Sequence, residues 1–358
     1  MYKYSIIFQG MKLIRRLLFP IAMLYGLILS IRNGLFNIKI FKGQHTTIPS
    51  IGIGNLSIGG TGKSIVVDYL ITILHRNYFI SVLSRGYGRK SRGFIMANTS
   101  STALEIGDEP FQFLKKHPKI RVAVGEDRVR AVNKLLKIDS KINLLILDDV
   151  MQHRWIIADH LLLTTTYADP FFNNFPFPSG NLREFSKGKK RSESILVTKC
   201  PSDIGMKDRI NFEKKCKLAS NQKIFFTKIS YSKTIINVQN KQSVDYLKGK
   251  KVILVTGIAN PHPLLDFLKS KNILFKHLNY RDHFNFNKRT IEKIKNEAGN
   301  SLILSTEKDY GRLYPLMKSD KLFYIPISLS FFSKNEEIEF NDRIKSFIDA
   351  KQNAITSN

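Results

Sequence analysis

Short runs of apolar residues alternate along the chain with longer stretches in which apolar and polar positions recur at helical spacing. In the first part of the chain these runs predict buried strands near residues 48–53, 80–83, 122–124, 144–147, 161–163 and 195–197. Strands that are apolar throughout, rather than at alternate positions, are typical of parallel sheets covered by helices on both faces. The sequence therefore predicts an α/β fold with a mostly parallel sheet.

A second, shorter series of apolar runs predicts a smaller second α/β domain, with strands near residues 252–255, 302–304 and 322–325. Two segments rich in β-branched and aromatic residues, Phe225–Val238 and Phe323–Phe332, can pair as linker strands between the domains. The chain then divides into an N-terminal apolar helix (1–36), a larger domain (37–225), linker strands with the smaller domain (226–332), and a C-terminal helix and tail (333–358).

The N-terminal region contains fifteen consecutive uncharged residues, Leu17–Ile31, between Arg16 and Arg32. A helix of this length reaches roughly 22 Å, less than the roughly 30 Å of a bilayer's hydrocarbon core. A core helix of the first domain has the same pattern, whereas a signal peptide is disfavoured because no small-x-small cleavage site follows. We favour a helix that lies in one leaflet of a membrane, bent or broken at Pro20 and Gly26.

The stretch from Ser57 to Ser64 joins a predicted strand to a predicted helix. This is the layout of a phosphate-binding loop (P-loop), in which backbone N–H groups point at a polyphosphate at the positive end of the helix. Serine stands where the general GxxxxGK motif has its first glycine, but the strand-loop-helix context supports the assignment. The predicted nucleotide-binding residues are Ser57, Ile58, Gly59, Gly60, Thr61, Gly62, Lys63 (the cation) and Ser64 (a hydroxyl ligand of Mg²⁺).

Two aspartates follow a predicted strand downstream of this loop. Residues 142–150 read INLLILDDV, so Asp148 and Asp149 stand at the carboxyl end of a buried strand. Carboxylates in that position, beside a phosphate-binding loop, hold the metal ion of a bound nucleotide. The pattern predicts that Asp148 and Asp149 bind the Mg²⁺ of a nucleoside triphosphate.

Three other polar segments have both a structural and a functional interpretation. Gly107–Pro110 is explained by the start of a helix, with proline at the first helical position and aspartate as the cap. Ser84–Arg89 presents two arginines that either grasp phosphate or lie in a solvated turn. Pro178–Glu184, followed by a basic run, either gates the nucleotide site or is a surface loop. The residues alone leave these alternatives open.

The chain is strongly basic, with 57 lysine and arginine residues against 29 acidic ones and a net charge of +28. Such an excess favours an anionic partner: membrane phospholipid, nucleic acid or a phosphorylated substrate. The lysines are scattered and no aromatic RNA-binding motif accompanies them, so we expect no nucleic-acid partner. Two cysteines, Cys200 and Cys216, are too few for a disulfide framework, and we expect both to be free thiols.

Ten segments, in this order along the chain, resemble the tetraacyldisaccharide 4'-kinase family, the lipid A 4'-kinases of Gram-negative bacteria. They are GNLSIGGTGKS (54–64), SRGYGR (84–89), GDEP (107–110), EDRVRA (126–131), LDDVMQHR (147–154), PSGNLRE (178–184), VTKCP (197–201), TGIANP (256–261), RDHFNF (281–286) and STEKD (305–309). The resemblance implies a membrane-associated P-loop kinase on the cytoplasmic face of the inner membrane. Its reaction is implied to be transfer of the γ-phosphate of ATP to the 4'-hydroxyl of an acylated glucosamine disaccharide 1-phosphate.

The resemblance also implies catalytic roles that the residues alone do not reveal. Asp108, in the GDEP segment, is implied to accept the proton of the attacking sugar hydroxyl. His283, in the RDHFNF segment, is implied to orient Asp108 and support its charge. Lys63 is implied to neutralise charge on the transferred phosphoryl group.

The remaining implied roles concern the metal, the phosphates and the partners. Glu184 is implied to contribute near the Mg²⁺ with Ser64, Asp148 and Asp149, and Arg128 to contact phosphate. The implied cofactors are ATP and Mg²⁺. The implied partners are the acylated disaccharide and a membrane phospholipid surface, and the oligomeric state stays open.

A P-loop GTPase or metal-insertion regulator is the alternative class. It requires an Asn-Lys-x-Asp motif for guanine. Residues 198–201 read TKCP and lack the closing aspartate, and residues 306–309 read TEKD, with lysine one place late. The sequence therefore favours adenine.

Overall fold

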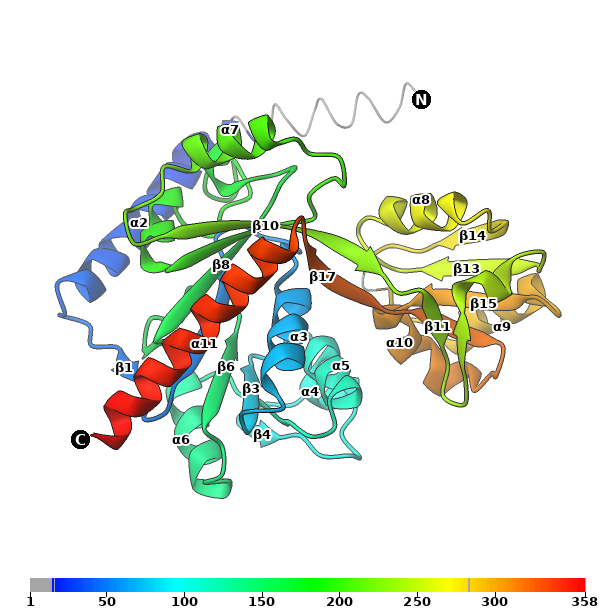
Figure 1. Cartoon of the computed structure of the whole chain (residues 1–358), viewed down its shortest axis with the longest axis horizontal. Coiled ribbons are helices and arrows are strands. Elements are labelled where there is room, and N and C mark those ends of the chain that lie inside the picture. Colours follow the sequence, from blue (N-terminus) through cyan, green and yellow to red (C-terminus); the bar gives the residue numbers. More distant parts are fainter. Residues whose placement is uncertain (1–14, 16, 283, 358) are drawn as a thin grey trace.

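The computed structural model of the 358-residue chain describes residues 15, 17–282 and 284–357. The chain forms a nine-stranded sheet and a six-stranded sheet, which lie next to each other with their own helices (Figure 1). A small separate pairing joins β1 (Gln44–His45) to β7 (Ile156–Ile157). Two sheets of unequal size, each with covering helices, agree with the predicted α/β fold.

The nine-stranded sheet has the order β17-β10-β9-β8-β2-β6-β3-β5-β4. Its inner strands from β10 to β5 run parallel, and β17 and β4 run antiparallel at the two edges. The strands predicted from apolar runs are all present. The sheet consists of β2 (Ser50–Asn55), β3 (Ile80–Ser84), β4 (Ile95–Met96), β5 (Arg121–Val124), β6 (Leu144–Asp148), β8 (His160–Thr166), β9 (Ser194–Thr198), β10 (Lys223–Tyr231) and β17 (Ile327–Phe331).

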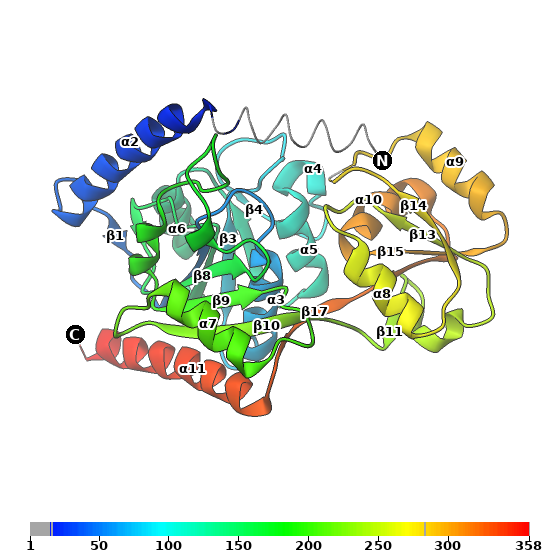
Figure 2. The same ribbon diagram turned by 90° about the horizontal axis from the view of Figure 1, so that it is seen from above.

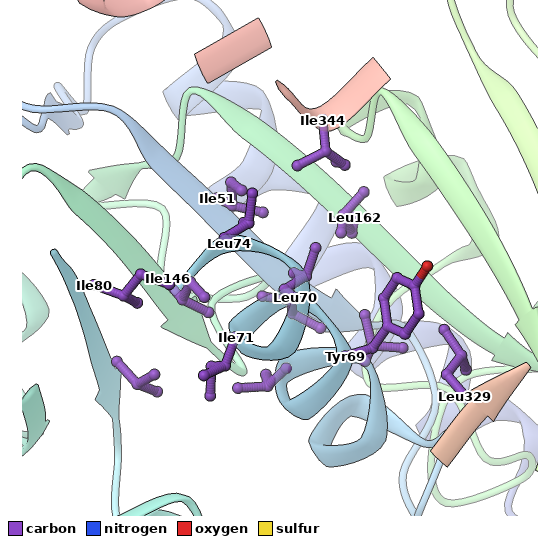
Figure 3. Close-up of a cluster of buried hydrophobic side chains, with 14 of the residues drawn as sticks. Ile51, Tyr69, Leu70, Ile71, Leu74, Ile80, Ile146, Leu162, Leu329 and Ile344 are labelled. Atoms are coloured by element: carbon purple, nitrogen blue, oxygen red, sulfur yellow. The ribbon is translucent and has the colours of Figure 1, made fainter. Parts of the chain in front are cut away.

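Helices cover both faces of this sheet, which explains why its strands are apolar at successive positions. Ile146 on β6 packs into a cluster with helices α3 (Lys63–Leu74), α5 (Asp108–Lys116) and α11 (Lys334–Thr356), part of which Figure 3 shows around Leu70 and Ile344. The next residue, Leu147, packs into the cluster that includes α6 (Arg128–Ile138) and α7 (Met206–Cys216). Successive side chains of a strand point to opposite faces, so the sheet has two separate cores.

The six-stranded sheet has the order β12-β11-β16-β15-β13-β14, and its strands from β16 to β14 run parallel. It consists of β11 (Thr234–Ile236), β12 (Lys241–Ser243), β13 (Val252–Thr256), β14 (Phe275–Asn279), β15 (Leu302–Thr306) and β16 (Leu322–Ile325), with helices α8 (His262–Ser270), α9 (Lys288–Ala298) and α10 (Glu307–Met317). Strand β14 was not expected, because as an edge strand it carries the polar residues Lys276, His277 and Asn279.

Shorter elements complete the chain. They are helix α4 (Ala103–Ile106) and single 3₁₀ turns at Phe171–Asn173, Ser186–Arg191 and Val244–Leu247. Cys200 and Cys216 are both buried and free, as expected.

The two segments expected to link the sheets do pair. Strand β10 pairs antiparallel with β17 in the larger sheet, from Thr227 opposite Phe331 to Tyr231 opposite Ile327. Beyond this pair, Ile236 on β11 lies opposite Tyr324 on β16 in the smaller sheet. Helix α11 then packs on the larger sheet, with Ile344 fully buried. The exact domain boundaries given above stay predictions.

Helix α2 (Phe19–Asn37) lies at one edge of the molecule, far from the smaller sheet (Figures 1 and 2). The expected break at Pro20 and Gly26 is wrong. Pro20 lies in the first turn, where its missing N–H removes no helical hydrogen bond. Gly26 lies where an added Cβ would come within 2.6 Å of the Phe185 ring, so a glycine permits close packing there. By length and composition, this helix is apolar enough to cross a membrane.

Candidate active site

The phosphate-binding loop connects β2 to α3 near the middle of the larger sheet. Lys63 and Ser64 are the first two residues of α3, and Gly62 is its N-cap in a left-handed conformation (φ +83°). The Asn55 side chain donates to the carbonyl of Ser57 (2.7 Å), and the hydroxyls of Thr61 and Thr164 are 2.7 Å apart. These contacts brace the loop against β8, so its backbone N–H groups are positioned by the sheet.

The individual loop residues differ in exposure. Ser57 is buried and pairs with Leu182, and Thr61 is also buried. The Ile58 side chain is half exposed, and its backbone N–H donates to the Asn181 carbonyl (2.6 Å), which ties the loop to the segment before Arg183. Gly59 has φ +114° and no neighbour within 4 Å of an added Cβ, which leaves open space beside its backbone.

Asp149 is held next to the lysine of the loop. Lys63 Nζ lies 3.4 Å from Asp149 Oδ1, and Arg183 Nη1 donates to both oxygens of the same carboxylate at 2.9 and 3.0 Å. Asp149 has φ +50°, a left-handed conformation directly after β6 that is uncommon for non-glycine residues. Burial would raise the pKa of Asp149, but the charges of Lys63 and Arg183 outweigh it and hold the pKa below its ordinary value.

Asp148, the last residue of β6, is buried with an unusual environment. Its Oδ2 accepts a hydrogen bond from the Ser84 hydroxyl (2.9 Å), and its Oδ1 has no hydrogen-bond partner among the described residues. Burial, followed by the negative charges of Glu109 and Asp149, raises the pKa of Asp148 to about 7. A buried carboxylate oxygen without a donor, beside two further carboxylates, is a site that a cation would stabilise.

Glu109 connects the phosphate-binding loop to the other acidic residues. Its Oε1 accepts hydrogen bonds from the Ser64 hydroxyl and from Lys308 Nζ, the latter at 3.1 Å. Burial would raise the pKa of Glu109, but the Lys308 charge and the Ser64 hydrogen bond lower it overall. Glu109 is therefore an ionised carboxylate at the N-terminus of α3.

The oxygen donors around Ser64 suit Mg²⁺, which keeps water and substrate phosphates among its ligands, better than a metal ion that is bound by protein side chains alone. In the described part of the chain, no three His, Cys, Asp or Glu side chains form a group that could hold a metal ion. Mg²⁺ typically takes one or two carboxylates and completes its shell with water and substrate phosphates. Ser64, Asp148 and Glu109 offer these hard oxygen donors, and the unpartnered Asp148 Oδ1 fits such an ion.

Asp108 begins helix α5 next to Glu109. Gly107 is the N-cap of this helix, so the expectation that Asp108 caps it is wrong. The Asp108 carboxylate instead forms an ion pair with Arg312 of α10, a helix that packs on the smaller sheet. His283, the expected partner of Asp108, lies outside the described residues.

Glu184 lies in a different set of contacts from the acidic residues above. Arg191 donates to both of its oxygens (2.7 and 2.9 Å), Asn33 of α2 donates to Oε2 (2.8 Å) and Gln152 donates to Oε1 (3.1 Å). These donors tie helix α2 to the loop that carries Arg183. The structure thus places Glu184 among three donors and its neighbour Arg183 on Asp149.

Two further basic candidates have mainly structural contacts. Arg128 is buried and donates to the carbonyls of Gly125 and Asp148. Burial lowers its pKa to about 10. Arg89 pairs with Glu126 (2.5 Å) and is nearly buried, whereas Arg85 is exposed and is the arginine of the Ser84–Arg89 loop open to a ligand.

The sequence matches a known family over nearly its whole length. The family model described as tetraacyldisaccharide-1-P 4'-kinase matches residues 14–348. The chain belongs to the tetraacyldisaccharide 4'-kinase family. The ten ordered segments and the geometry of the P-loop lie within the matched region.

Relatives and a solved structure agree with this membership. A tetraacyldisaccharide 4'-kinase of Flavobacterium psychrophilum is 43% identical over 342 residues, covering 95% of this chain and 98% of the relative. One of Bacteroides thetaiotaomicron is 35% identical over 356 residues, covering 94% and 93%. The "apo" form of LpxK from Aquifex aeolicus in complex with ATP superposes with a TM-score of 0.76 at 25% identity, covering 94% of this chain and 99% of that one. The predicted P-loop α/β fold is confirmed.

Four residues of this site were not apparent from the sequence: Glu109, Arg183, Lys308 and Arg312. Glu109 and Arg183 adjoin the named residues Asp108 and Glu184, so their motifs contained a signal. Lys308 and Arg312 approach from α10, about two hundred positions away. Lys308 stands in the STEKD segment and Arg312 shortly after it, but no local pattern shows which carboxylates they meet.

Replacing Asp148 by asparagine is expected to stabilise the metal-free protein at pH 8. The pKa of Asp148 is raised to about 7 in the folded state, so the unfolded state releases this proton first. The contribution of Asp148 to stability is therefore lost as pH rises from about 4 to about 7, and the total is of the order of a few kcal/mol. Denaturant unfolding in EDTA at pH 5 and pH 8 measures this.

In a parallel titration without EDTA, Mg²⁺ with ATP is expected to stabilise the unchanged protein and to stabilise the Asp148→Asn variant much less, because a neutral amide is a poorer ligand. Equal unfolding free energies of the two proteins at pH 8 in EDTA, with equal pH slopes, would contradict the assignment of Asp148.

Proposed function

We propose that the protein transfers the γ-phosphate of ATP to the 4'-hydroxyl of an acylated glucosamine disaccharide 1-phosphate. The observation that supports this most directly is the convergence of three elements: the P-loop residues Lys63 and Ser64, the acidic residues of β6, and the Asp108–Glu109 pair of α5. Glu109 accepts from the Ser64 hydroxyl, so its neighbour Asp108 lies close to where a γ-phosphate would be held. Family membership supports the same reaction.

In this proposal the protein chiefly positions the reactants and neutralises charge, because the transition state of phosphoryl transfer is loose and spreads negative charge over the transferred oxygens. The backbone N–H groups of the loop and Lys63 bind the phosphates, and Asp149 with Arg183 keeps Lys63 in place. Ser64, Asp148 and Glu109 are the proposed Mg²⁺ ligands. When bound, Mg²⁺ would supply positive charge that offsets the negative charge of the phosphates.

Asp108 is the proposed general base. The sugar hydroxyl oxygen forms the new bond to the γ-phosphorus as the bond to the β,γ-bridging oxygen breaks, and the hydroxyl proton goes to the Asp108 carboxylate. His283 is proposed to assist, as the resemblance implies. Glu184, with Arg191 and Asn33 on its oxygens, is proposed to hold the Arg183 loop rather than the metal.

A transfer assay tests the proposed reaction directly. Purified protein, ATP labelled at the γ-position and detergent-dispersed acylated disaccharide 1-phosphate should yield label in the organic phase. GTP in place of ATP, and ATP without the lipid, are the controls. Absence of label in the lipid with folded protein that binds ATP would refute the proposed function, and equal use of GTP would favour the GTPase-like alternative.

We further propose that helix α2 holds the protein on the cytoplasmic face of the inner membrane. Four of its exposed apolar residues recur at three- and four-residue intervals and so share one face: Ile21, Leu24, Ile28 and Ile31. Ala22 and Gly26 are buried against the protein, on the other side. A helix with one face on the protein and an apolar face to solvent suits the interfacial layer of a bilayer, which also attracts a chain of charge +28.

Two charges on that face are expected to release the protein from lipid. The variant Leu24→Glu/Ile28→Glu should bind anionic vesicles at least about tenfold more weakly, since a loss of about 1.4 kcal/mol already gives this factor. Vesicle co-sedimentation measures the effect. The control Phe79→Glu/Leu274→Glu changes the same net charge at two exposed apolar residues on other elements. Equal vesicle binding by both variants would refute the role of α2.

A further inference from the structure

Helix α5 packs on the larger sheet and helix α10 on the smaller one, and the two helices contact each other where the two sheets lie side by side (Figure 2). Their facing side chains form oppositely charged pairs. Asp108 of α5 pairs with Arg312 of α10, Glu109 with Lys308 at 3.1 Å, and Lys116 with Glu307 at 3.8 Å. The first half of α10, from Glu307 to Arg312, thus carries charges opposite to those at both ends of α5.

Arg312 is fixed from the side of the smaller sheet. Its Nη1 lies 3.6 Å from Oδ1 of Asp309, which is fully buried. The other oxygen of Asp309 accepts from the backbone N–H of Gly257 (2.9 Å), after β13, and from the hydroxyl of Thr306 (2.7 Å), at the end of β15. Asp309 thus contacts two strands of the smaller sheet and the Arg312 guanidinium. The same guanidinium pairs with the Asp108 carboxylate of α5, on the larger sheet.

We propose that Arg312 is a positioning residue for the general base: it orients the Asp108 carboxylate and makes its placement depend on the docking of α10 against α5. This inference rests on the proposed function. Arg312 acts through Asp108 and does not touch the reacting atoms.

Lys308 acts beside it on the neighbouring carboxylate. Lys308 and Arg312 are one helical turn apart and so share a face of α10. Lys308 binds Glu109, which also accepts from Ser64 at the start of α3. One face of α10 thus binds both adjacent carboxylates of the GDEP segment: Asp108, the proposed base, and Glu109, which contacts the P-loop. The positions of both carboxylates therefore depend on how the smaller sheet and its helix α10 dock on the larger sheet.

Arginine suits this position better than lysine. A guanidinium donates through separate nitrogens in a rigid plane, and here Nη2 binds Asp108 while Nη1 faces Asp309. A lysine carries the charge on one nitrogen and cannot reproduce this planar bridge. Arg312→Lys should therefore retain docking while orienting Asp108 poorly.

The first test compares three variants in the transfer assay with the full chain. Arg312→Ala should lower kcat by about 10²-fold, the effect of misplacing a catalytic group by about 1 Å, with KM for ATP within about threefold of the unchanged protein. Arg312→Lys should recover part of this loss. The control Lys116→Met removes another pair of the same α5–α10 contact, together with the Lys116–Asp68 pair to α3 (2.8 Å), away from Asp108, and should leave kcat within about threefold.

The second test is a double-mutant cycle with Asp108→Asn. If Arg312 acts through Asp108, adding Arg312→Ala to Asp108→Asn should lower kcat no further. Losses that multiply in the double variant, or a normal kcat in folded Arg312→Ala, would overturn the inference. So would an equal loss in Lys116→Met, which would indicate general weakening of the contact. If the unchanged protein transfers no phosphate, the proposed function fails instead, and the two failures are thereby distinguished.

Discussion

Asp108→Ala is expected to lower kcat for phosphate transfer by about 10²–10⁴-fold, the usual contribution of a positioned general base. ATP affinity should stay close to that of the unchanged protein, because Asp108 lies on α5 and pairs with Arg312 rather than with the P-loop. Single-turnover transfer and equilibrium binding of ATP measure the two quantities separately.

Two further variants make this result specific. Asp108→Asn keeps the shape of the side chain and should lose nearly as much activity, since an amide accepts a proton poorly. Asp203→Ala removes an exposed carboxylate in the turn between β9 and α7 and should change kcat little. Loss of ATP binding in Asp108→Ala, with the fold intact by circular dichroism, would be inconsistent with a base and would indicate a role in nucleotide binding.

Lys63→Ala is expected to lower kcat/KM by about 10²–10³-fold, as the loss of one preorganised charge at a transition state typically does. ATP affinity should fall as well, in contrast to the Asp108 variants, because Lys63 is the first residue of α3 and the cation of the loop. The fold should persist, since Arg183 still pairs with Asp149 at 2.9 Å.

Lys63→Met and Lys119→Ala sharpen this test. Methionine keeps the length of the side chain without its charge and should behave like alanine. Lys119 is exposed in the turn after α5, and its removal changes the net charge equally without touching the site. Normal ATP binding and turnover in Lys63→Met would rule out the phosphate role of Lys63.

The central strands β2, β3, β6 and β9 of the larger sheet could be predicted from sequence because each is buried on both faces, and full burial leaves an unbroken apolar run such as Leu144–Leu147. The short edge strand β4 was not predicted, because its two residues are only half-buried. The P-loop was predictable because its glycines and Lys63 lie next to one another in the sequence and form a local motif between a strand and a helix. Strand β14 was not, because an edge strand needs fewer apolar positions. The course of α2 was misjudged at Pro20, whose effect depends on its place in the helix.

The site could be predicted as far as its parts are local in sequence. Asp148 and Asp149 follow a strand, and the resemblance gave Asp108. The partners of these residues depend on tertiary contacts: Lys308 and Arg312 reach the site because α10 docks on α5, which no periodicity reveals. The raised pKa of Asp148 likewise follows from burial beside Glu109, a contact between β6 and α5 that is invisible in the sequence.

The pairing of β10 with β17 has a consequence for how this kinase could have been assembled. Tyr231 and Ile327 are cross-strand neighbours, so the whole smaller sheet occupies the place of a turn in a single hairpin. Topologically, the smaller sheet is an insertion into a complete P-loop fold, whose last strand (β17) and C-terminal helix (α11) follow the inserted segment. An ancestral nucleotide-binding protein could thus have gained Lys308 and Arg312 by lengthening one loop, without rebuilding its own core.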